Sequence, residues 1–377
     1  MMYDAIIIGA GIMGSATAFQ LTEIGKKCLL IDRFPLLHTN GSSHGESRII
    51  RKSYDENHFA TLMTSAYNLW NEIEQQYKEQ FIVTTGGLDF GIEESPYMKK
   101  VEQTLKSQRL VYELLNHEQV MKRFPAFQLP SNYFGLYQSE AGIVLASKSL
   151  YFFQQTAQKK GLEIVTGEKV SLIKEEQNHL TVLTKSKTYK TKKVIICVGT
   201  WINEFFRNYK IAHRTKILPV CYGYWKVQQP DLFKAGSFPI FIAWGEKTFY
   251  GFGSLERENY FKIGAHYSYS ELDYRTEDAT KTIDQQITND LQSFVETTFP
   301  SAESDNYTID SCYYTMNDNE NFILDVHPDN SNVVFGGGFS GHGFKFAPLI
   351  GKILAELALT GTTTYEIKKF KFGNFAV

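Results

Sequence analysis

The sequence is poor in the residues that mark several classes of protein. Its 377 residues include only 4 cysteines, at positions 28, 197, 221 and 312, and none of them belongs to a CxxC pair. So few cysteines in a chain of this length exclude a disulfide scaffold, and their wide spacing argues against a cysteine-rich zinc site. We therefore expect neither a disulfide framework nor a metal.

Neither sign of charge is in surplus. Lys and Arg total 39, Asp and Glu total 41, and the formal net charge is −2. This balance argues against a disordered acidic chain. It also argues against a nucleic-acid partner, because neutralising phosphates requires an excess of basic residues, although a local basic patch is compatible with these totals.

Long hydrophobic runs are missing as well. No apolar run approaches the ~20 residues that a membrane helix requires. The apolar segment Ala5–Met13 differs from a signal-peptide core, because the acidic Asp4 precedes it and glycines interrupt it. We predict a soluble, cytoplasmic protein with no membrane partner. The hydrophobic fraction of 43% is typical of a globular chain, and its length suggests about two domains of roughly 150 residues each.

The N-terminus has the pattern of a βαβ unit. The β-branched run Tyr3–Ile8 predicts a buried strand. A helix over Ser15–Ile24 should follow and end at Gly25, and Cys28–Ile31 should form the next strand. Strand, glycine turn, helix and strand thus fit within the size of one βαβ unit.

The turn of this unit predicts dinucleotide binding. Gly9 allows a tight turn, Gly11 lets a pyrophosphate approach the backbone, and Gly14 lets the helix pack closely on the strand. The pyrophosphate would meet unpaired amides at the helix N-terminus. Asp32 follows the second strand, where it can accept hydrogen bonds from a ribose. This motif leaves open whether the nucleotide is FAD or NAD.

Later segments predict further elements. An amphipathic helix should cover His58–Tyr77. Other helices are expected at Leu150–Lys160, Glu277–Phe299 and Leu349–Leu359. Strands with glycine turns are expected at Phe81–Phe90 and Gly135–Val144. Further strands are expected at Leu162–Thr166, Val170–Lys174, Leu180–Lys185, Val194–Val198, Thr215–Lys226, Pro239–Ala243, Thr248–Phe252, Phe261–His266 and Asn332–Phe335. A glycine-rich turn is expected over Gly336–Gly343.

These elements predict an α/β fold with two domains that are interleaved in sequence. A Rossmann-like, nucleotide-binding domain should comprise residues 1–85, 145–215 and 320–377. A β-rich substrate domain with an antiparallel or mixed sheet should comprise residues 86–144 and 216–319.

Two further motifs carry chemistry. In GSSHGESRIIR, residues 41–51, two arginines flank an apolar dipeptide. This suggests that at least one arginine is partly buried and needs an anion, although a surface basic pair is the alternative. In FGGGFSGHGFKF, residues 335–346, a glycine-dense turn enters a helix, so its amides suit a group that becomes anionic. An ordinary β–α turn is the alternative reading.

Together, the N-terminal fingerprint, GSSHGESRIIR and GFSGHGFKF resemble the monomeric sarcosine oxidase and N-methyltryptophan oxidase family, within the D-amino-acid-oxidase-like flavoproteins. The resemblance runs essentially end to end. It identifies the first domain as an FAD-binding domain and implies that FAD is attached covalently through Cys312. Ser43 stands where relatives usually carry a second histidine, so we assign it no role.

The resemblance also implies the roles of individual residues. Arg51 and Lys345 match the clamp for the substrate carboxylate, and Lys262 matches the lysine that activates oxygen. The other implied positions are His266, Tyr314, Tyr250 and Gly341 on the substrate side, Arg48 and His44 near the flavin ring, and Gly343 with Lys345 beside the cofactor. From the residues alone, Lys262 would be an ordinary strand lysine and His266 a packing residue.

The predicted protein is a monomeric flavoprotein oxidase that demethylates an N-methyl amino acid. Sarcosine is the favoured substrate and N-methyltryptophan the alternative. The partners are then this small molecule and O₂, and the products are formaldehyde, the primary amino acid and hydrogen peroxide. Two rivals are a nicotinamide-dependent dehydrogenase with the same N-terminal motif and a flavin-binding module without turnover.

Overall fold

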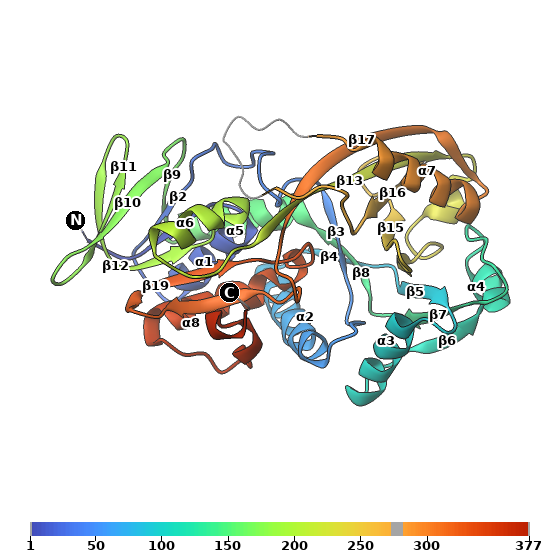
Figure 1. The fold of residues 1–377 in the computed structure, drawn as a ribbon, viewed down its shortest axis with the longest axis horizontal. Coiled ribbons are helices and arrows are strands. Elements are labelled where there is room, and N and C mark those ends of the chain that lie inside the picture. The colour runs from blue at the N-terminus through green and yellow to red at the C-terminus, as the bar shows by residue number, and fades with distance from the viewer. Residues whose placement is uncertain (1, 273–281, 376–377) are drawn as a thin grey trace.

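The computed structural model describes residues 2–272 and 282–375. Two large sheets lie in the two halves of the molecule (Figure 1). The N-terminal and C-terminal elements belong to one half, and the middle of the chain builds most of the other (Figure 1). This arrangement confirms the predicted α/β class with a parallel-rich sheet and a mostly antiparallel sheet. The residue boundaries proposed for the two domains stay a prediction.

The first sheet has the order β10-β11-β12-β1-β2-β9, and β19, which pairs with β18, joins the C-terminal half of β12. Its central pairs, β12–β1, β1–β2 and β2–β9, are parallel. The strands are β1 (Met2–Ile8), β2 (Cys28–Ile31), β9 (Glu163–Val165), β10 (Val170–Glu175), β11 (Leu180–Thr184), β12 (Thr188–Ile196), β18 (Ile323–His327) and β19 (Asn330–Gly337). Predicted strands in this half are therefore confirmed, with shifts at their ends.

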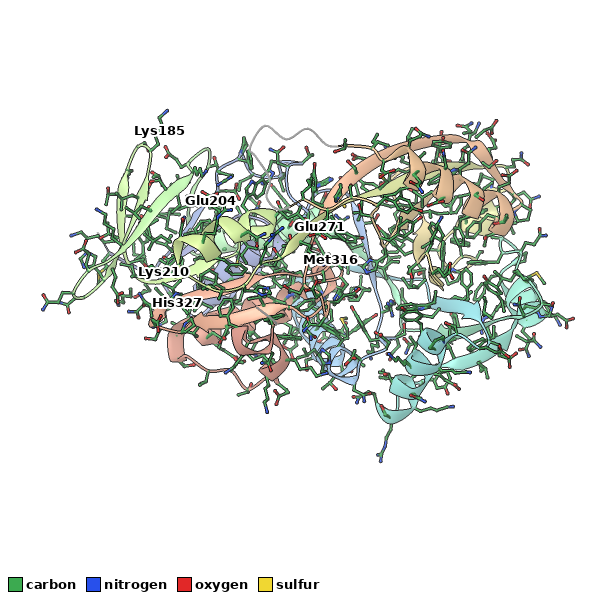
Figure 2. The ribbon with its side chains drawn as sticks, viewed as in Figure 1. Lys185, Glu204, Lys210, Glu271, Met316 and His327 are labelled. Atoms are coloured by element: carbon green, nitrogen blue, oxygen red, sulfur yellow. The ribbon has the colours of Figure 1, made fainter. Side chains whose placement is uncertain are left out.

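Helices cover both faces of the first sheet, which explains its continuous apolar strands. One face packs on α1, α5 and α8, and the other contacts α6 and the C-terminal segment. The helices of the described chain are α1 (Ile12–Glu23), α2 (Asn57–Tyr77), α3 (Pro96–Ser107), α4 (His117–Arg123), α5 (Ala146–Lys159), α6 (Ile202–Asn208), α7 (Gln285–Thr298) and α8 (Ala347–Thr360). Figure 2 shows that Lys185, in the turn between β11 and β12, points away from the body of the molecule.

The second sheet has the order β17-β13-β16-β15-β14-β5-β7-β6. Among the strand pairs described for this sheet, only β14–β5 is parallel. The strands are β5 (Gly87–Ile92), β6 (Glu113–Asn116), β7 (Tyr133–Gln138), β13 (Lys216–Val227), β14 (Ile240–Trp244), β15 (Phe249–Gly253), β16 (Tyr260–Ala265) and β17 (Ala302–Met316). Met316 ends β17 near the middle of the molecule, where the chain returns to the first half (Figure 2).

The two faces of the second sheet differ. One face carries an aromatic core that packs on α7, with Phe241, Phe261 and Phe299 among its members. The opposite face carries Tyr222, Tyr224, Cys312 and Tyr314. Because side chains alternate along a strand, this division fixes which residues of β13, β16 and β17 face the cavity described below.

The two segments that were predicted as strands with glycine turns each divide into two strands. Phe81–Phe90 forms β4 (Ile82–Thr84) and β5, which belong to different sheets. The chain turns between them at Gly86, where φ is +73° and an added Cβ would lie 2.3 Å from the hydroxyl of Tyr137. Gly135–Val144 divides in the same way into β7 and β8 (Gly142–Leu145). Strands β4 and β8 form a small third sheet with β3 (Ser47–Ile50), which the sequence analysis did not anticipate.

Other differences concern the ends of elements. The helix expected over Glu277–Phe299 begins at Gln285, because the side chain of Asp284 accepts hydrogen bonds from the amides that follow it. The start expected for this helix lies outside the described residues. Gly336 and Gly337 continue β19 and are not part of the turn. Helices α3 and α4 and strand β17 were missed, since their sequences are rich in charged and polar residues.

Candidate active site

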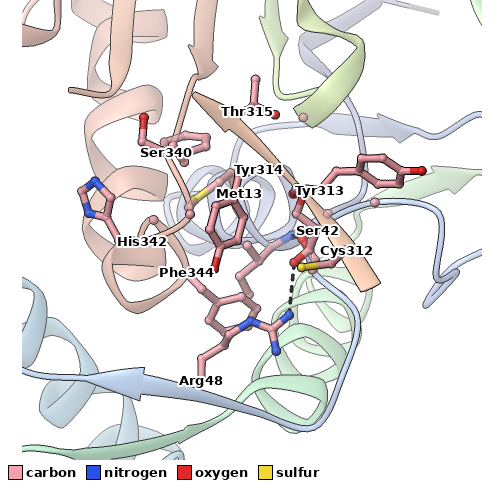
Figure 3. Close-up of a pocket in the computed structure, with 18 of the residues that line it drawn as sticks. Met13, Ser42, Arg48, Cys312, Tyr313, Tyr314, Thr315, Ser340, His342 and Phe344 are labelled. Carbon is pink, nitrogen blue, oxygen red and sulfur yellow. Dashed lines mark hydrogen bonds between the residues drawn. The ribbon is translucent and has the colours of Figure 1, made fainter. Parts of the chain in front are cut away.

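A cavity of about 630 Å³ lies between the two large sheets. It is lined by the fingerprint turn after β1, the segment 41–51, one face of the second sheet and the glycine-rich turn before α8. Arg48, Cys312, Tyr314 and Phe344 gather around it (Figure 3). Its volume lies within the range of sites for cofactors and small ligands.

The fingerprint forms one end of the cavity. An added Cβ at Gly14 would lie 1.9 Å from the carbonyl oxygen of Gly9, so the close packing of α1 on β1 requires glycine there. The Asp32 carboxylate accepts hydrogen bonds from the amides of Ala10 (2.6 Å) and Phe34 (2.8 Å), and it also lines the cavity. These contacts fix the acid beside the fingerprint, as expected for a nucleotide site.

Backbone carbonyls hold Arg48 in the cavity wall. Its guanidinium donates to the carbonyl oxygens of Ser47 (2.8 Å), Ser42 (3.2 Å) and His44. It also lies over the ring of Phe344, 5.6 Å from the centroid. Arg48 thus presents a fixed positive charge to the cavity. His44 itself is not among the lining residues, and its Nδ1 lies 2.8 Å from the Gly41 carbonyl oxygen.

Arg51 and Lys345 lie at another part of the cavity wall, and both are 7% exposed. The Arg51 Nη1 donates to Ser53 Oγ (3.0 Å) and lies 3.5 Å from Asp89 Oδ1. Burial, followed by repulsion from Arg51, holds the pKa of Lys345 well below its usual range, while Asp89 acts in the opposite direction. The protein therefore buries two basic side chains here.

A hydrogen-bond chain orients Lys345. Its Nζ donates to the Tyr54 hydroxyl (2.9 Å) and to the His342 carbonyl oxygen (3.1 Å). Burial and the charge of Lys345 hold the pKa of His342 well below its usual range, so its ring is neutral. Its Nε2 lies 3.2 Å from the Glu320 carbonyl oxygen and must donate, so Nδ1 accepts from the Tyr54 hydroxyl at 3.2 Å.

His266, Tyr250 and Tyr314 form a neighbouring part of the wall on the second sheet. The rings of His266 and Tyr314 are 5.3 Å apart, and the Tyr314 and Tyr250 hydroxyls are 3.5 Å apart. Burial, reinforced by the charges of Lys345 and Arg51, lowers the pKa of His266 to about 4. Burial raises the pKa of Tyr250 to about 12. This wall is therefore polar but uncharged near neutral pH.

Lys262 projects from β16 into a ring of aromatic faces and is 3% exposed. Its Nζ lies 4.7 Å from the centroid of the Tyr222 ring and 3.8 Å from Glu256 Oε1. Glu256 also accepts hydrogen bonds from Ser47 (2.8 Å) and Tyr224 (2.7 Å). Burial, followed by repulsion from Arg48, lowers the pKa of Lys262 to about 8 despite the nearby carboxylate.

Two cysteines line the cavity. Cys312 lies on β17 next to the tyrosine-rich wall, and Cys197 follows β12 beside the fingerprint. Burial raises the pKa of Cys197 to about 12, which is typical of an unreactive thiol. The remaining cysteines, Cys28 and Cys221, are buried and do not line the cavity. Cys312 is thus the cavity cysteine on the side of Lys262 and Arg48.

The C-terminal turn has the backbone that its glycines predict. Gly341 has φ +77°, and an added Cβ would lie 2.4 Å from the Tyr314 ring. Ser340 adopts the same left-handed region with φ +47°, which costs a non-glycine residue free energy and often marks a functional site. Within the described residues, no group accepts a hydrogen bond from the amides of Gly341 and Gly343.

The structure brings most of the expected site residues to one cavity. Those that line it are Gly9, Gly11, Asp32, Arg48, Arg51, Tyr250, Lys262, His266, Cys312, Tyr314, Gly341, Gly343 and Lys345. Gly14 and His44 do not line the cavity. Two carboxylates of the site, Asp89 beside Arg51 and Glu256 beside Lys262, were not predicted from the sequence. A lone acidic residue within the apolar run of β5 was a signal for Asp89, whereas nothing in the sequence marked Glu256.

Comparison with known proteins agrees with this arrangement. The family model described as DAO, FAD dependent oxidoreductase, matches residues 4–357. Peroxisomal sarcosine oxidase of Homo sapiens is 35% identical over 99% of this chain and 96% of its own length. N-methyl-L-tryptophan oxidase of Salmonella dublin is 28% identical, with 100% of both chains covered.

A solved structure has the same fold. The open form of NikD, an unusual amino acid oxidase, matches with a TM-score of 0.87 at 23% identity, covering 98% of this chain and 97% of NikD. The resemblance found from the sequence motifs is thereby confirmed, since the family model spans nearly the whole length of the chain. The chain belongs to the DAO family of FAD-dependent oxidoreductases.

Proposed function

We propose that this protein is a flavoprotein oxidase that uses O₂ to remove the N-methyl group of a secondary amino acid, with sarcosine as the favoured substrate. The observation that carries the proposal is one cavity with two buried basic side chains, Arg51 and Lys345, in one part of its wall and a third, Lys262, in another. Such a cavity can hold a carboxylate in one place and stabilise a developing oxygen anion in another.

The residues present fit FAD. Asp32 and the amide-lined fingerprint turn suit the ribose and the pyrophosphate. The amides of Gly341 and Gly343, which have no partner within the described residues, suit the end of the flavin ring that becomes anionic. Arg48 would balance charge on the ring. When bound, the flavin supplies a two-electron acceptor for the amine and passes the electrons to O₂.

The substrate side follows from the charges of the wall. Arg51 offers a planar pair of donors and Lys345 a point charge, so both would bind the substrate carboxylate. His266 is neutral near pH 7 because the pKa of its ring is lowered to about 4. It therefore adds no third positive charge beside the substrate amine, which must be neutral to react. Tyr314 and Tyr250 would complete this part of the pocket.

On the oxygen side, Lys262 would act as a fixed cation. The first electron transferred to O₂ creates an anion, and a buried ammonium stabilises it more strongly than water does. Tyr222 and Tyr224 keep the ammonium desolvated, while Glu256 keeps it in place. Lys262 would thus speed the return of electrons to O₂ without touching the amine.

A peroxide assay tests the proposed activity. Purified protein should release hydrogen peroxide and formaldehyde in equal amounts from sarcosine, and less efficiently from N-methyl-L-tryptophan. If the second substrate reacts more efficiently, the pocket serves a bulkier amino acid. Inertness to both compounds, with bound flavin that no amine bleaches anaerobically, would favour a flavin-binding module without turnover.

We propose covalent attachment of FAD through Cys312. Acid precipitation of the holoenzyme should leave the yellow colour in the pellet, and Cys312→Ser should release it or fail to load it. Cys197→Ser is the matched control, because this cysteine lines the same cavity beside the fingerprint. Colour retained in the pellet of Cys312→Ser would assign the attachment elsewhere.

Assembly and location are also part of the proposal. A monomer is expected, and light scattering of the holoenzyme tests it. No helix within residues 2–272 or 282–375 is long and apolar enough to cross a membrane. The cytoplasmic location stays a prediction, since the name of the human relative describes that protein as peroxisomal. A nicotinamide-dependent dehydrogenase is not proposed, because the matching family is described as FAD-dependent.

A further inference from the structure

Asp89 is a buried carboxylate to which the proposed reaction gives no part. It lies in the middle of β5, between β14 and β7, and is 2% exposed. It is not among the residues that line the cavity, so a bound ligand would not touch it. A buried carboxylate is costly unless it is paired, which makes its partners informative.

Every partner of Asp89 belongs to or adjoins the proposed carboxylate clamp. Its Oδ1 lies 3.5 Å from Arg51 Nη1 and accepts a hydrogen bond from Trp244 Nε1 (2.8 Å). Its Oδ2 accepts a hydrogen bond from Ser53 Oγ, which in turn accepts one from Arg51 Nη1. Asp89 and Ser53, neither of which lines the cavity, therefore hold Nη1 in place.

This arrangement leaves the rest of the guanidinium for a ligand. Arg51 also lies over the rings of Tyr54 and Trp244, 4.9 and 5.6 Å from their centroids, so the plane of the group is fixed. Its Nε and Nη2 donate to no group within the described residues. Arg51 lines the cavity, so the donors that remain are available to a carboxylate there.

The charges of this region balance around one ligand carboxylate. Arg51 is a cation that lies 3.5 Å from the anion Asp89. Burial and Arg51 hold the pKa of Lys345 well below its usual range, so a bound anion beside Lys345 favours its protonated form. Tyr54, Tyr67, His266 and His342 lie near them and are neutral near pH 7, because burial raises the pKa of both tyrosines and lowers the pKa of both imidazoles. Asp55 and Glu320 also line the cavity and interact with Tyr54, but both are acidic and supply no further cation. A monocarboxylate bound with Lys345 protonated gives two positive and two negative charges. A second ligand carboxylate would have no cation to pair with.

We propose that Asp89 positions Arg51 and restricts the clamp to ligands with a single carboxylate. This inference rests on the proposed function, since it names the substrate class of the same site as monocarboxylic secondary amines. The physical reason is that an unpaired anion beside these buried groups is strongly disfavoured, so a dicarboxylate binds only if it brings a proton with it.

Calorimetry of the wild-type holoenzyme with acetate and malonate tests the charge balance. Titrations at pH 7.5 in two buffers of different ionisation enthalpy count the protons that accompany each anion. We expect malonate to take up about one proton more than acetate, as linkage requires when the second carboxylate is bound neutral. Equal proton counts for the two anions would overturn the proposal without any variant.

Asp89→Asn removes the charge and keeps the shape. We expect the malonate-to-acetate affinity ratio to rise by about tenfold or more, which is the effect of one nearby charge on such an equilibrium. We also expect malonate binding to take up no more protons than acetate binding. Ser53→Ala keeps the charge but loosens Arg51, so both anions should weaken by similar factors. A ratio unchanged in Asp89→Asn would overturn the role of Asp89.

Asp310→Asn is the matched control. It removes a carboxylate from the same sheet on the Lys262 side, where Asp310 accepts a hydrogen bond from Tyr222, and should leave the affinity ratio as in the wild type. A ratio that rises equally in this variant would also overturn the proposal. Because these titrations need no turnover, an inert enzyme with the expected proton counts would overturn only the proposed function. Failure of acetate to bind would overturn the clamp itself.

Discussion

At the scale of single residues, burial decides which groups of the cavity wall carry charge. The pKa of His266 is lowered to about 4 and that of Lys262 to about 8, and in both groups burial is the largest cause. The two pKa shifts leave the groups in different charge states. At pH 7 the imidazole is neutral, whereas the ammonium is still protonated, because neutral pH lies above the first value and below the second. One face of the second sheet therefore carries a neutral imidazole and a charged ammonium, which are the charge states that the proposed amine and oxygen sites require.

Removing the charge of Lys262 should slow the reaction with oxygen selectively. In Lys262→Met, anaerobic reduction by substrate should keep nearly the wild-type rate, whereas reoxidation by O₂ should slow by about tenfold or more, because one electrostatic donor is lost from the site where the anion develops. Stopped-flow spectroscopy separates the two half-reactions. Lys226→Met, on the exposed rim of the same sheet, is the control.

The same lysine sets a pH dependence with a definite sign. Below pH 8 the ammonium is protonated, so reoxidation should be fast, and its rate should fall as the pH rises through about 8. The Lys262→Met variant should lack this step. A wild-type reoxidation rate that is constant from pH 7 to about pH 10, beyond the lowered pKa, would remove Lys262 from the oxygen reaction.

Lys345 should matter only to substrates that carry a carboxylate. In Lys345→Met, kcat/KM for sarcosine should fall. The loss of transition-state binding free energy should be about 2–5 kcal/mol, because Arg51 alone would leave the buried carboxylate poorly paired. A secondary amine without a carboxylate, such as dimethylamine, should lose far less. Equal losses for the two amines would show that the variant disturbs the fold and not the clamp.

At the scale of elements, the need for glycine in the turn before α8 can be tested by comparison with a second glycine that has the same φ. Gly341 and Gly361 both have φ +77°, but an added Cβ meets the Tyr314 ring at Gly341 and nothing within 4 Å at Gly361. Gly361→Ala should cost about 1–2 kcal/mol from the left-handed backbone alone. Gly341→Ala should cost more and should also weaken FAD binding, because Tyr314 must move.

Urea unfolding and flavin retention give the two readouts. Equal destabilisation by the two substitutions, with full flavin retention in both, would show that the space around Gly341 can relax and that the turn does not need glycine to hold Tyr314 in place.

Elements with strong local signals were predictable from the sequence. The βαβ unit could be predicted from its β-branched run, its three glycines and Asp32, because each of these features determines the structure of neighbouring residues. The run from Phe81 to Phe90 contains glycines that mark a turn, but its two strands enter different sheets, because β4 pairs with β8 and β5 pairs with β14 from distant parts of the chain. Sequence patterns do not contain such a contact.

The same reason separates the site residues that were found from those that were missed. Lys262 and Cys312 lie in motifs that resemble a family, so their place in a cavity could be expected. Asp89 and Glu256 acquire a role in the site only through Arg51 and Lys262, which come from other parts of the chain. A carboxylate that acts as the partner of a distant cation leaves almost no local pattern.

At the scale of the whole molecule, the cavity belongs to neither half alone. The first half supplies the fingerprint and Asp32, and the second sheet supplies Lys262, His266 and Cys312. The chain crosses between the halves several times, as Figure 1 shows. A ligand held by both halves should therefore stabilise the fold as one cooperative unit.

This coupling predicts that the melting temperature depends on FAD when the covalent bond is absent. In Cys312→Ser, which we expect to bind FAD reversibly, Tm should rise steadily as free FAD increases, with about 2.7 kcal/mol gained at a hundredfold excess over Kd. The wild-type holoenzyme, already loaded, should show no such rise. Calorimetry should give a single transition for the loaded variant, because both sheets contact the same ligand. Two transitions, of which FAD moves only the one that belongs to the first half, would mean that the second sheet does not contribute to holding the cofactor.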